Sequence, residues 1–176
     1  MITPRATEGL DAHRSAAAAF ETAVSQIPAE VWAQPAAPGK WSPAEITEHL
    51  ARSYESHLTE LRGGPGIRVR VKGLKLFILR WTVMPKLLRT GRFPEGVRAP
   101  SEVAPVTPAG TREAGVARFR ELAATFEGEM AGRLEVGKGR ITHPFFGKLT
   151  LDQALRFVEL HVRHHGRQLP GASRMT

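Results

Sequence analysis

The chain has 176 residues, a length that favours one domain with a continuous hydrophobic core. Hydrophobic residues make up 41% of it and aromatic residues 7%, which excludes the class of wholly disordered proteins. The sequence has no cysteine, and this excludes disulfides, thiolate metal ligands, iron–sulfur clusters and a cysteine nucleophile. No stretch reaches the roughly 18 apolar residues of a membrane span and no secretory signal is visible, so we expect a cytoplasmic protein with a single domain over residues 1–176.

Positive charge is concentrated in one segment. The formal net charge is +8, yet residues 62–98 hold ten basic side chains against one acid, Glu95, and the rest of the chain is close to neutral. Such a distribution predicts an electropositive patch rather than a uniformly basic protein. The patch would attract an anionic substrate or a carboxylated thiol, and a solvated cationic face is the alternative interpretation.

The first predicted helix covers residues 7–27. Apolar residues recur three and four positions apart along it, and Pro28 ends the pattern. His13 lies on the same apolar stripe, where we expect a buried, neutral histidine.

The second predicted helix starts with a clear signature. Ser42 is a favourable N-cap, Pro43 suits the first helical position, and Glu45 completes a capping box with Ser42. The glycine-rich stretch 63–66 ends the helix. We expect Trp41 to pack against the first turn rather than to contact substrate.

Residues 69–89 mix apolar and basic side chains and predict a basic amphipathic helix, perturbed near Pro85 and ended by Gly91. Residues 67–71 also alternate as a strand would, so a strand at this point is an alternative. The proline-rich residues 93–109 are expected to form a loop.

Two further helices follow. Thr107 and Pro108 resemble a helix start, and the pattern continues to about Leu134. After an irregular stretch over residues 137–148, Thr150 and Gln153 form a second capping box. That last helix is ended by the pair at 170–171, and residues 170–176 are expected to fray. Together these patterns predict an all-α helical bundle with long connections and one extra basic helical segment.

The histidines of the last helix are spaced informatively. His161 and His165 are four residues apart, so on a helix both imidazoles lie on one face and can converge on a divalent ion. A third ligand from another helix would complete a set with open coordination positions. His49, on the apolar stripe of the second predicted helix, is the leading candidate, and His57, two turns further on, is its rival. The alternative is that each histidine is an ordinary core or surface residue.

Other candidates are weaker. His164 and Glu48 each project about 100° away from a neighbouring candidate ligand on a helix, which favours surface positions for both. A role as general base is a minor option for Glu48. His143, before a proline, is expected to be a loop residue, with a place at the rim of the site as the alternative.

Two segments resemble a known family. Residues 39–50 (GKWSPAEITEHL) resemble the first motif of the DinB-like (YfiT-type) superfamily, and residues 143–150 (HPFFGKLT) with 161–168 (HVRHHGRQ) resemble the second. The resemblance implies an antiparallel four-helix bundle that holds a divalent metal ion through three histidines. In this sequence the matching positions are His49, His161 and His165.

The resemblance also bears on chemistry. It implies that Gln168, which shares the face of His161 and His165, orients a ligand or a bound water, with a C-terminal helix cap as the alternative. Members of the superfamily are associated with metal-dependent hydrolysis and with thiol-dependent transfer or isomerisation, so both reaction classes stay open here. We expect zinc or nickel, a small-molecule substrate, a low-molecular-weight thiol if the reaction is a transfer, and a homodimer as one option.

A different class of function uses the basic segment. Residues 68–92, with Phe77, Trp81 and Leu87 among lysines and arginines, would suit a non-catalytic binding module at an anionic membrane surface or on nucleic acid. No zinc finger, glycine-rich phosphate loop or recognition-helix motif is visible, so sequence-specific binding of nucleic acid is not expected.

Overall fold

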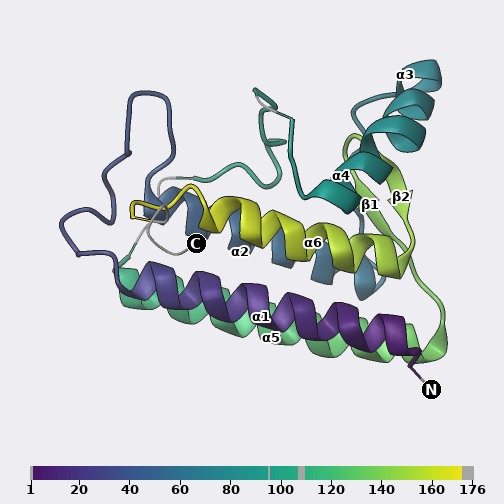
Figure 1. Cartoon of the computed structure of the whole chain (residues 1–176), viewed down its shortest axis with the longest axis horizontal. Coiled ribbons are helices and arrows are strands. Elements are labelled where there is room, and N and C mark those ends of the chain that lie inside the picture. Colours follow the sequence, from purple (N-terminus) through teal and green to yellow (C-terminus); the bar gives the residue numbers. More distant parts are fainter. Residues whose placement is uncertain (1, 95, 107–109, 172–176) are drawn as a thin grey trace.

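Helices account for most of the chain, and a short hairpin precedes the last of those that the structure describes (Figure 1). The computed structural model describes residues 2–94, 96–106 and 110–171. The four long helices are α1 (Pro4–Ser25), α2 (Pro43–Leu61), α5 (Arg112–Val136) and α6 (Leu151–Gly166). The shorter elements are α3 (Gly73–Ile78), the π-helix η1 (Leu79–Val83), α4 (Met84–Thr90), β1 (Ile141–His143) and β2 (Gly147–Leu149).

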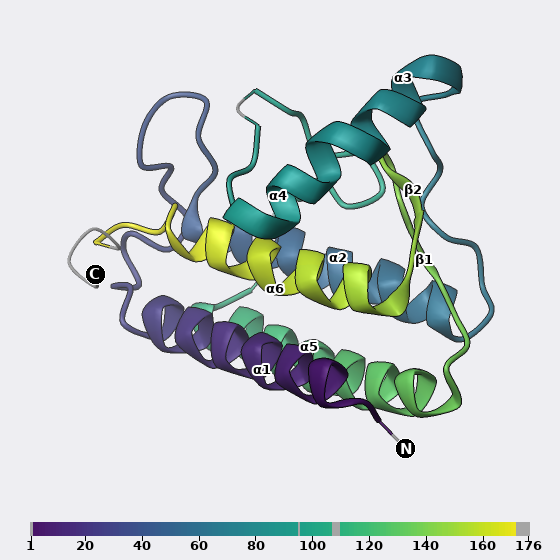
Figure 2. The same cartoon turned by 45° about the vertical axis from the view of Figure 1, so that its right-hand side comes forward.

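The long helices form a four-helix bundle, as predicted. Helices α1 and α5 form one layer, and α2 and α6 form the other (Figures 1 and 2). Helix α1 packs against α5 and α6, and α2 packs against α5. Two helices run in each direction, and α2 runs the same way as its neighbour α5 (Figure 1). The chain between these two parallel neighbours must therefore return along the bundle, which explains the long connection over residues 62–111.

The apolar stripes predicted from the sequence meet in one core, which includes aromatic side chains of α1, α2 and α5. His13 lies in this core with no exposed surface, and its Nε2 atom is 2.8 Å from the hydroxyl oxygen of Tyr54. Burial lowers the pKa of His13 to about 4, so the ring is neutral at pH 7. The prediction of a buried, neutral histidine is confirmed.

Both predicted capping boxes are present. In α2 the Glu45 backbone N–H donates to Ser42 Oγ (3.2 Å), and the Ser42 N–H donates to the Glu45 carboxylate (2.7 Å). In α6, Thr150 and Gln153 make the equivalent pair of bonds. These bonds satisfy N–H groups that a helix start leaves free, and so they define where the two helices begin.

The start of α5 differs from the prediction. The helix begins at Arg112, and the Thr111 hydroxyl caps it by accepting a hydrogen bond from the Ala114 N–H (3.2 Å). The predicted start at 107–108 was wrong, because Gly110 and Thr111 are not helical. The expected pair at 107–108 itself lies outside the described residues.

The basic segment is helical from Gly73 to Thr90, with a π turn in its middle. Pro85 has no N–H, and in a regular α-helix its ring would clash with the carbonyl of Trp81. In η1 the Met84 N–H instead reaches the Leu79 carbonyl, five residues back, which accommodates the proline. The predicted perturbation is confirmed, although it falls in the turn before the proline. Residues 67–71 form neither a strand nor a helix.

The stretch predicted to be irregular contains an antiparallel hairpin. Ile141 pairs with Leu149 and His143 pairs with Gly147, which has a φ of +69° that favours glycine. His143 therefore lies in strand β1. The prediction of a loop residue at this position was wrong. Strands of three residues are too short to give a periodic pattern. Among the described residues, no helix is both long and apolar enough to cross a membrane.

Candidate metal centre

Three histidines from two helices meet between α2 and α6. The Nε2 atom of His161 lies 3.1 Å from Nε2 of His49 and 3.0 Å from Nε2 of His165. In this group each histidine offers one nitrogen, and all three nitrogens lie within 4.8 Å of one another. The spacing of four residues in α6 thus places two rings together as predicted, and His49 joins them from α2.

In two of the rings, a hydrogen bond to Nδ1 decides that Nε2 faces the centre with its lone pair. His49 Nδ1 lies 2.7 Å from the Val103 carbonyl oxygen, and His165 Nδ1 lies 2.8 Å from Gln168 Oε1. Both oxygens only accept hydrogen bonds, so each Nδ1 carries the proton and donates it. The Nε2 atoms of His49 and His165 therefore present lone pairs to His161, whose single Nε2 position can donate to only one of them. A cation at the centre would satisfy all three.

Burial keeps these rings neutral. It lowers the pKa of His49 to about 4, and it holds the pKa of His161 and His165 well below the usual 6.5. His165 and His49 also lower the pKa of His161, and His49 lowers that of His165, because two imidazolium charges would repel at this distance. Neutral imidazole is the form that coordinates metals, so the three rings have the protonation state that metal coordination requires.

Gln168 contacts two histidines. Its Oε1 accepts from His165, and its amide N–H₂ donates to Nε2 of His164 (3.0 Å). Its backbone N–H also donates to the His165 carbonyl at the end of α6 (3.0 Å). The side chain thus has the position expected of a residue that orients a ligand, while the backbone bond belongs to the helix end.

Aromatic rings enclose the histidine group. Trp41 lies with its ring centroid 4.9 Å from that of His49 and 5.9 Å from that of His165. Phe157 stacks on His161 at 5.6 Å, and Phe93 lies 5.9 Å from the same ring. The Trp41 ring thus forms a wall of the histidine group, a position that the sequence did not predict.

The comparisons with known proteins agree with this architecture. A family model described as the DinB superfamily matches residues 12–169. The chain belongs to the DinB superfamily. Among solved structures it is similar to YfiT from Bacillus subtilis, with a TM-score of 0.62 and 16% identity over 99% of this chain and 90% of that one. At this identity the likeness shows a shared fold, and no curated protein matches the sequence.

In this DinB-superfamily chain, the rival ligand His57 lies apart from the group. His57 is buried on α2, and its ring centroid lies 6.0 Å from that of Phe126. Among the described residues, the group whose nitrogens could share a metal ion does not include His57. His164 also lies outside the group, and its ring packs against Phe93 at 4.6 Å. The structure therefore brings His49, and not His57, to the pair on α6.

Glu48 and His143 have structural partners of their own. The Glu48 carboxylate pairs with the Arg118 guanidinium of α5 (2.5 Å), so Glu48 is neither a freely solvated side chain nor directed at the histidines. His143 Nδ1 accepts from the backbone N–H groups of Phe145 and Phe146, and its ring lies 4.5 Å from that of Phe157. That ring contact places His143 behind one wall of the site.

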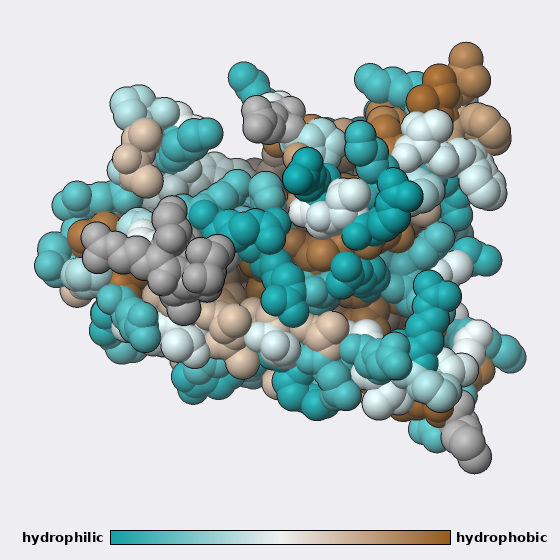
Figure 3. Space-filling view, viewed as in Figure 1, coloured by the Kyte–Doolittle hydropathy of each residue, from teal (hydrophilic) through white to brown (hydrophobic). Residues whose placement is uncertain are grey.

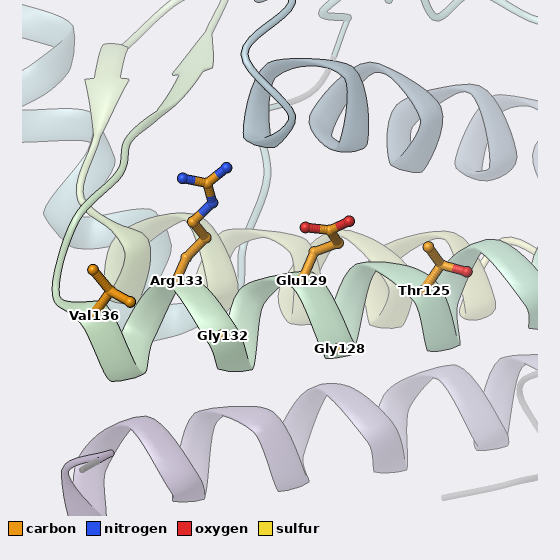
Figure 4. Close-up of a pocket in the computed structure, with 6 residues that line it drawn as sticks. All are labelled: Thr125, Gly128, Glu129, Gly132, Arg133 and Val136. Carbon is orange, nitrogen blue, oxygen red and sulfur yellow. The ribbon is translucent and has the colours of Figure 1, made fainter.

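A hollow on α5 lacks the chemistry of a site. Figure 4 shows it lined by the face of α5 from Thr125 to Val136, where two glycines provide no side chain. Its charged residues are already bound: Glu129 pairs with Arg62 (2.9 Å), and Arg133 donates to the Leu61 carbonyl. None of the three grouped histidines lines it.

Proposed function

We propose that this protein is a metal-dependent enzyme in which His49, His161 and His165 hold one divalent cation, with zinc and nickel as the leading identities. The observation that carries the proposal is the meeting of the Nε2 atoms of three neutral rings, which hydrogen bonds among themselves cannot all satisfy. Three imidazoles suit these metals and leave coordination positions open for other molecules. In support, the structurally similar YfiT is described as a probable metal-dependent hydrolase.

Hydrolysis of a small-molecule substrate is the reaction we favour. A divalent cation bound by neutral nitrogen ligands keeps its full charge, and it lowers the pKa of a bound water or thiol toward neutrality. The chain's own residues prepare the site for this chemistry. Val103 and Gln168 hold the rings of His49 and His165 in one tautomer, and the rings of Trp41 and Phe157 pack against the histidine group.

Transfer to or from a thiol is the second reaction class. The chain has no cysteine, so a thiol would have to come from a separate low-molecular-weight molecule. Such a cofactor would take an open position on the same cation. The two classes differ in whether turnover requires an added thiol, and this difference decides between them.

The first test of the proposal is metal analysis of the purified protein. The second is a screen of ester, amide and thioether-forming substrates with and without small thiols. We expect one divalent ion per chain and turnover that stops when a chelator removes the ion and returns when zinc or nickel is added. Turnover that persists without metal, or a protein that binds no divalent ion at saturating concentrations, would contradict the proposal.

A further inference from the structure

An exposed apolar stripe lies on the segment that projects from the bundle. Four large side chains have exposed fractions between 48% and 74%, and their spacing of three, four and seven residues puts them on one side of α3 and η1. They are Leu74, Phe77, Ile78 and Trp81. Figure 3 shows the resulting hydrophobic patch over α3, and Figures 1 and 2 show α3 standing away from the long helices.

The opposite side of the same segment is fixed to the protein. Met84 and Leu87 are buried in the core, and the Arg80 guanidinium donates to the carbonyls of Phe146 (2.9 Å) and Lys148 (2.7 Å). The apolar stripe is therefore held outward on an anchored element, with its apolar surface unburied. Soluble proteins rarely expose a contiguous patch of this kind without an interaction partner.

Basic side chains precede, interrupt and follow the stripe in the sequence. Lys72, Lys75, Lys86 and Arg89 are exposed, and none of them forms an ion pair within the described part of the chain. Arg70, by contrast, pairs with Glu102 at 2.5 Å. The charges of these four side chains are thus available to an anionic partner, whereas the charge of Arg70 is already neutralised.

We propose that the stripe docks this protein on an anionic membrane surface, with the four apolar side chains inserted among the headgroups and the flanking lysines on lipid phosphates and carboxylates. This pattern of large apolar residues on one face and lysine or arginine beside them is the one that binds helices in the plane of a membrane interface. Tryptophan and phenylalanine are suited to that depth.

The charge and the apolar character of the segment argue against two other partners. Two copies joined stripe to stripe would bring their unpaired lysines together. Nucleic acid would use the lysines but not four exposed apolar side chains. The proposal is independent of the metal centre, because none of the site residues belongs to the stripe.

Co-sedimentation of the full-length protein with phosphatidylcholine vesicles, with and without phosphatidylserine, tests the proposal. We expect binding only when phosphatidylserine is present, with a steep loss at high salt. Phe77→Ser combined with Trp81→Ser should weaken binding at least about tenfold. Lys72→Glu combined with Lys75→Glu should also weaken it at least about tenfold.

Matched variants elsewhere serve as controls. Val136→Ser changes another exposed apolar side chain (67% exposed) and Lys138→Glu another exposed lysine, and both should bind vesicles as the wild type does. Equal binding to neutral and anionic vesicles, or wild-type binding by the double serine variant, would overturn the proposal. Two further results would also overturn it. One is a dimer that light scattering detects without vesicles and that the double serine variant abolishes, and the other is binding to DNA by a protein that binds no vesicles.

Discussion

The Nε2 atoms of His49 and His161 lie 3.1 Å apart, although 112 positions separate the two residues in the chain. This distance joins α2 to α6, a pair of helices on the side of the bundle opposite the α1–α5 layer (Figure 2). Both rings are neutral, and His161 Nε2 can donate to only one of its two neighbours, so a lone pair is left that a bound cation would satisfy. The bundle thus brings together groups that gain from a bound cation.

Removing either histidine of α6 should abolish metal binding without unfolding the protein. With His161→Ala or His165→Ala, we expect elemental analysis to show loss of the bound ion and circular dichroism to show unchanged helix content, because two imidazoles hold an exchangeable ion poorly. His164→Ala is the matched control, since His164 lies next to His165 but outside the group. Full metal occupancy in both site variants would show that the ligands are other residues.

The third ligand is decided by comparing His49→Ala with His57→Ala. His49 Nε2 faces the pair on α6, whereas His57 packs near Phe126, so only His49→Ala should lose the ion. The measurement is the dissociation constant for zinc, obtained by competition with a chelating dye. A loss of affinity in His57→Ala as large as that in His49→Ala would contradict the assignment.

The sequence predicted the parts of the site that depend on local rules. Capping boxes located the starts of α2 and α6, and the spacing of His161 and His165 follows directly from helix geometry. Whether His49 or His57 completes the group could not be read from the stripe alone, because both histidines share it. That choice depends on how far α2 is shifted along α6, which packing of the whole bundle sets.

Other parts of the site have no local signature. Phe93 and Val103 come from the long connection, and they reach the histidines only because this connection returns along the bundle. A backbone carbonyl such as that of Val103 is chosen by position and not by residue type, so no sequence pattern marks it. The wall formed by Trp41 was missed for a related reason, since its place before a capping box is explained equally well by packing on the helix start.

Gln168→Ala should weaken metal binding without abolishing it. The change removes the acceptor that fixes the His165 tautomer, and the loss of such a partner costs about 10- to 100-fold in affinity. His164→Ala removes the other partner of the Gln168 amide and should leave affinity unchanged. If Gln168→Ala bound zinc as tightly as His164→Ala does, Gln168 would act only as part of the helix end.

The stability of the metal-free protein should fall in acid, partly through His57. Burial lowers the pKa of His57 to about 4, from 6.5 when unfolded. Between these pH values the unfolded chain binds one more proton, so the free energy of unfolding decreases as pH falls, by up to about 1.4 kcal/mol per pH unit for this group. The contribution is constant above pH 6.5 and levels off below pH 4.

His57→Leu isolates that contribution, because the ring nitrogen Nδ1 has no hydrogen-bond partner within the described part of the chain and leucine breaks no bond there. The free energy of unfolding is measured by urea denaturation from pH 4 to pH 8 with a chelator present. Below pH 6.5 it should depend less steeply on pH in the variant than in the wild type, and above pH 6.5 the two slopes should be equal. Parallel curves over the whole range would mean that His57 titrates normally in the folded protein.

Trp41 should report on the ion spectroscopically. Its ring centroid is 4.9 Å from that of His49, whereas Trp81 lies on the projecting segment. Copper(II) and nickel(II) quench indole fluorescence at short range, so titration with either ion should reduce the emission of the wild type to a plateau at one ion per chain. Trp41→Phe keeps an aromatic wall and should lose most of this quenching, while Trp81→Phe should retain it. Quenching that survives in Trp41→Phe and disappears in Trp81→Phe would place the bound ion on the basic segment instead of between α2 and α6.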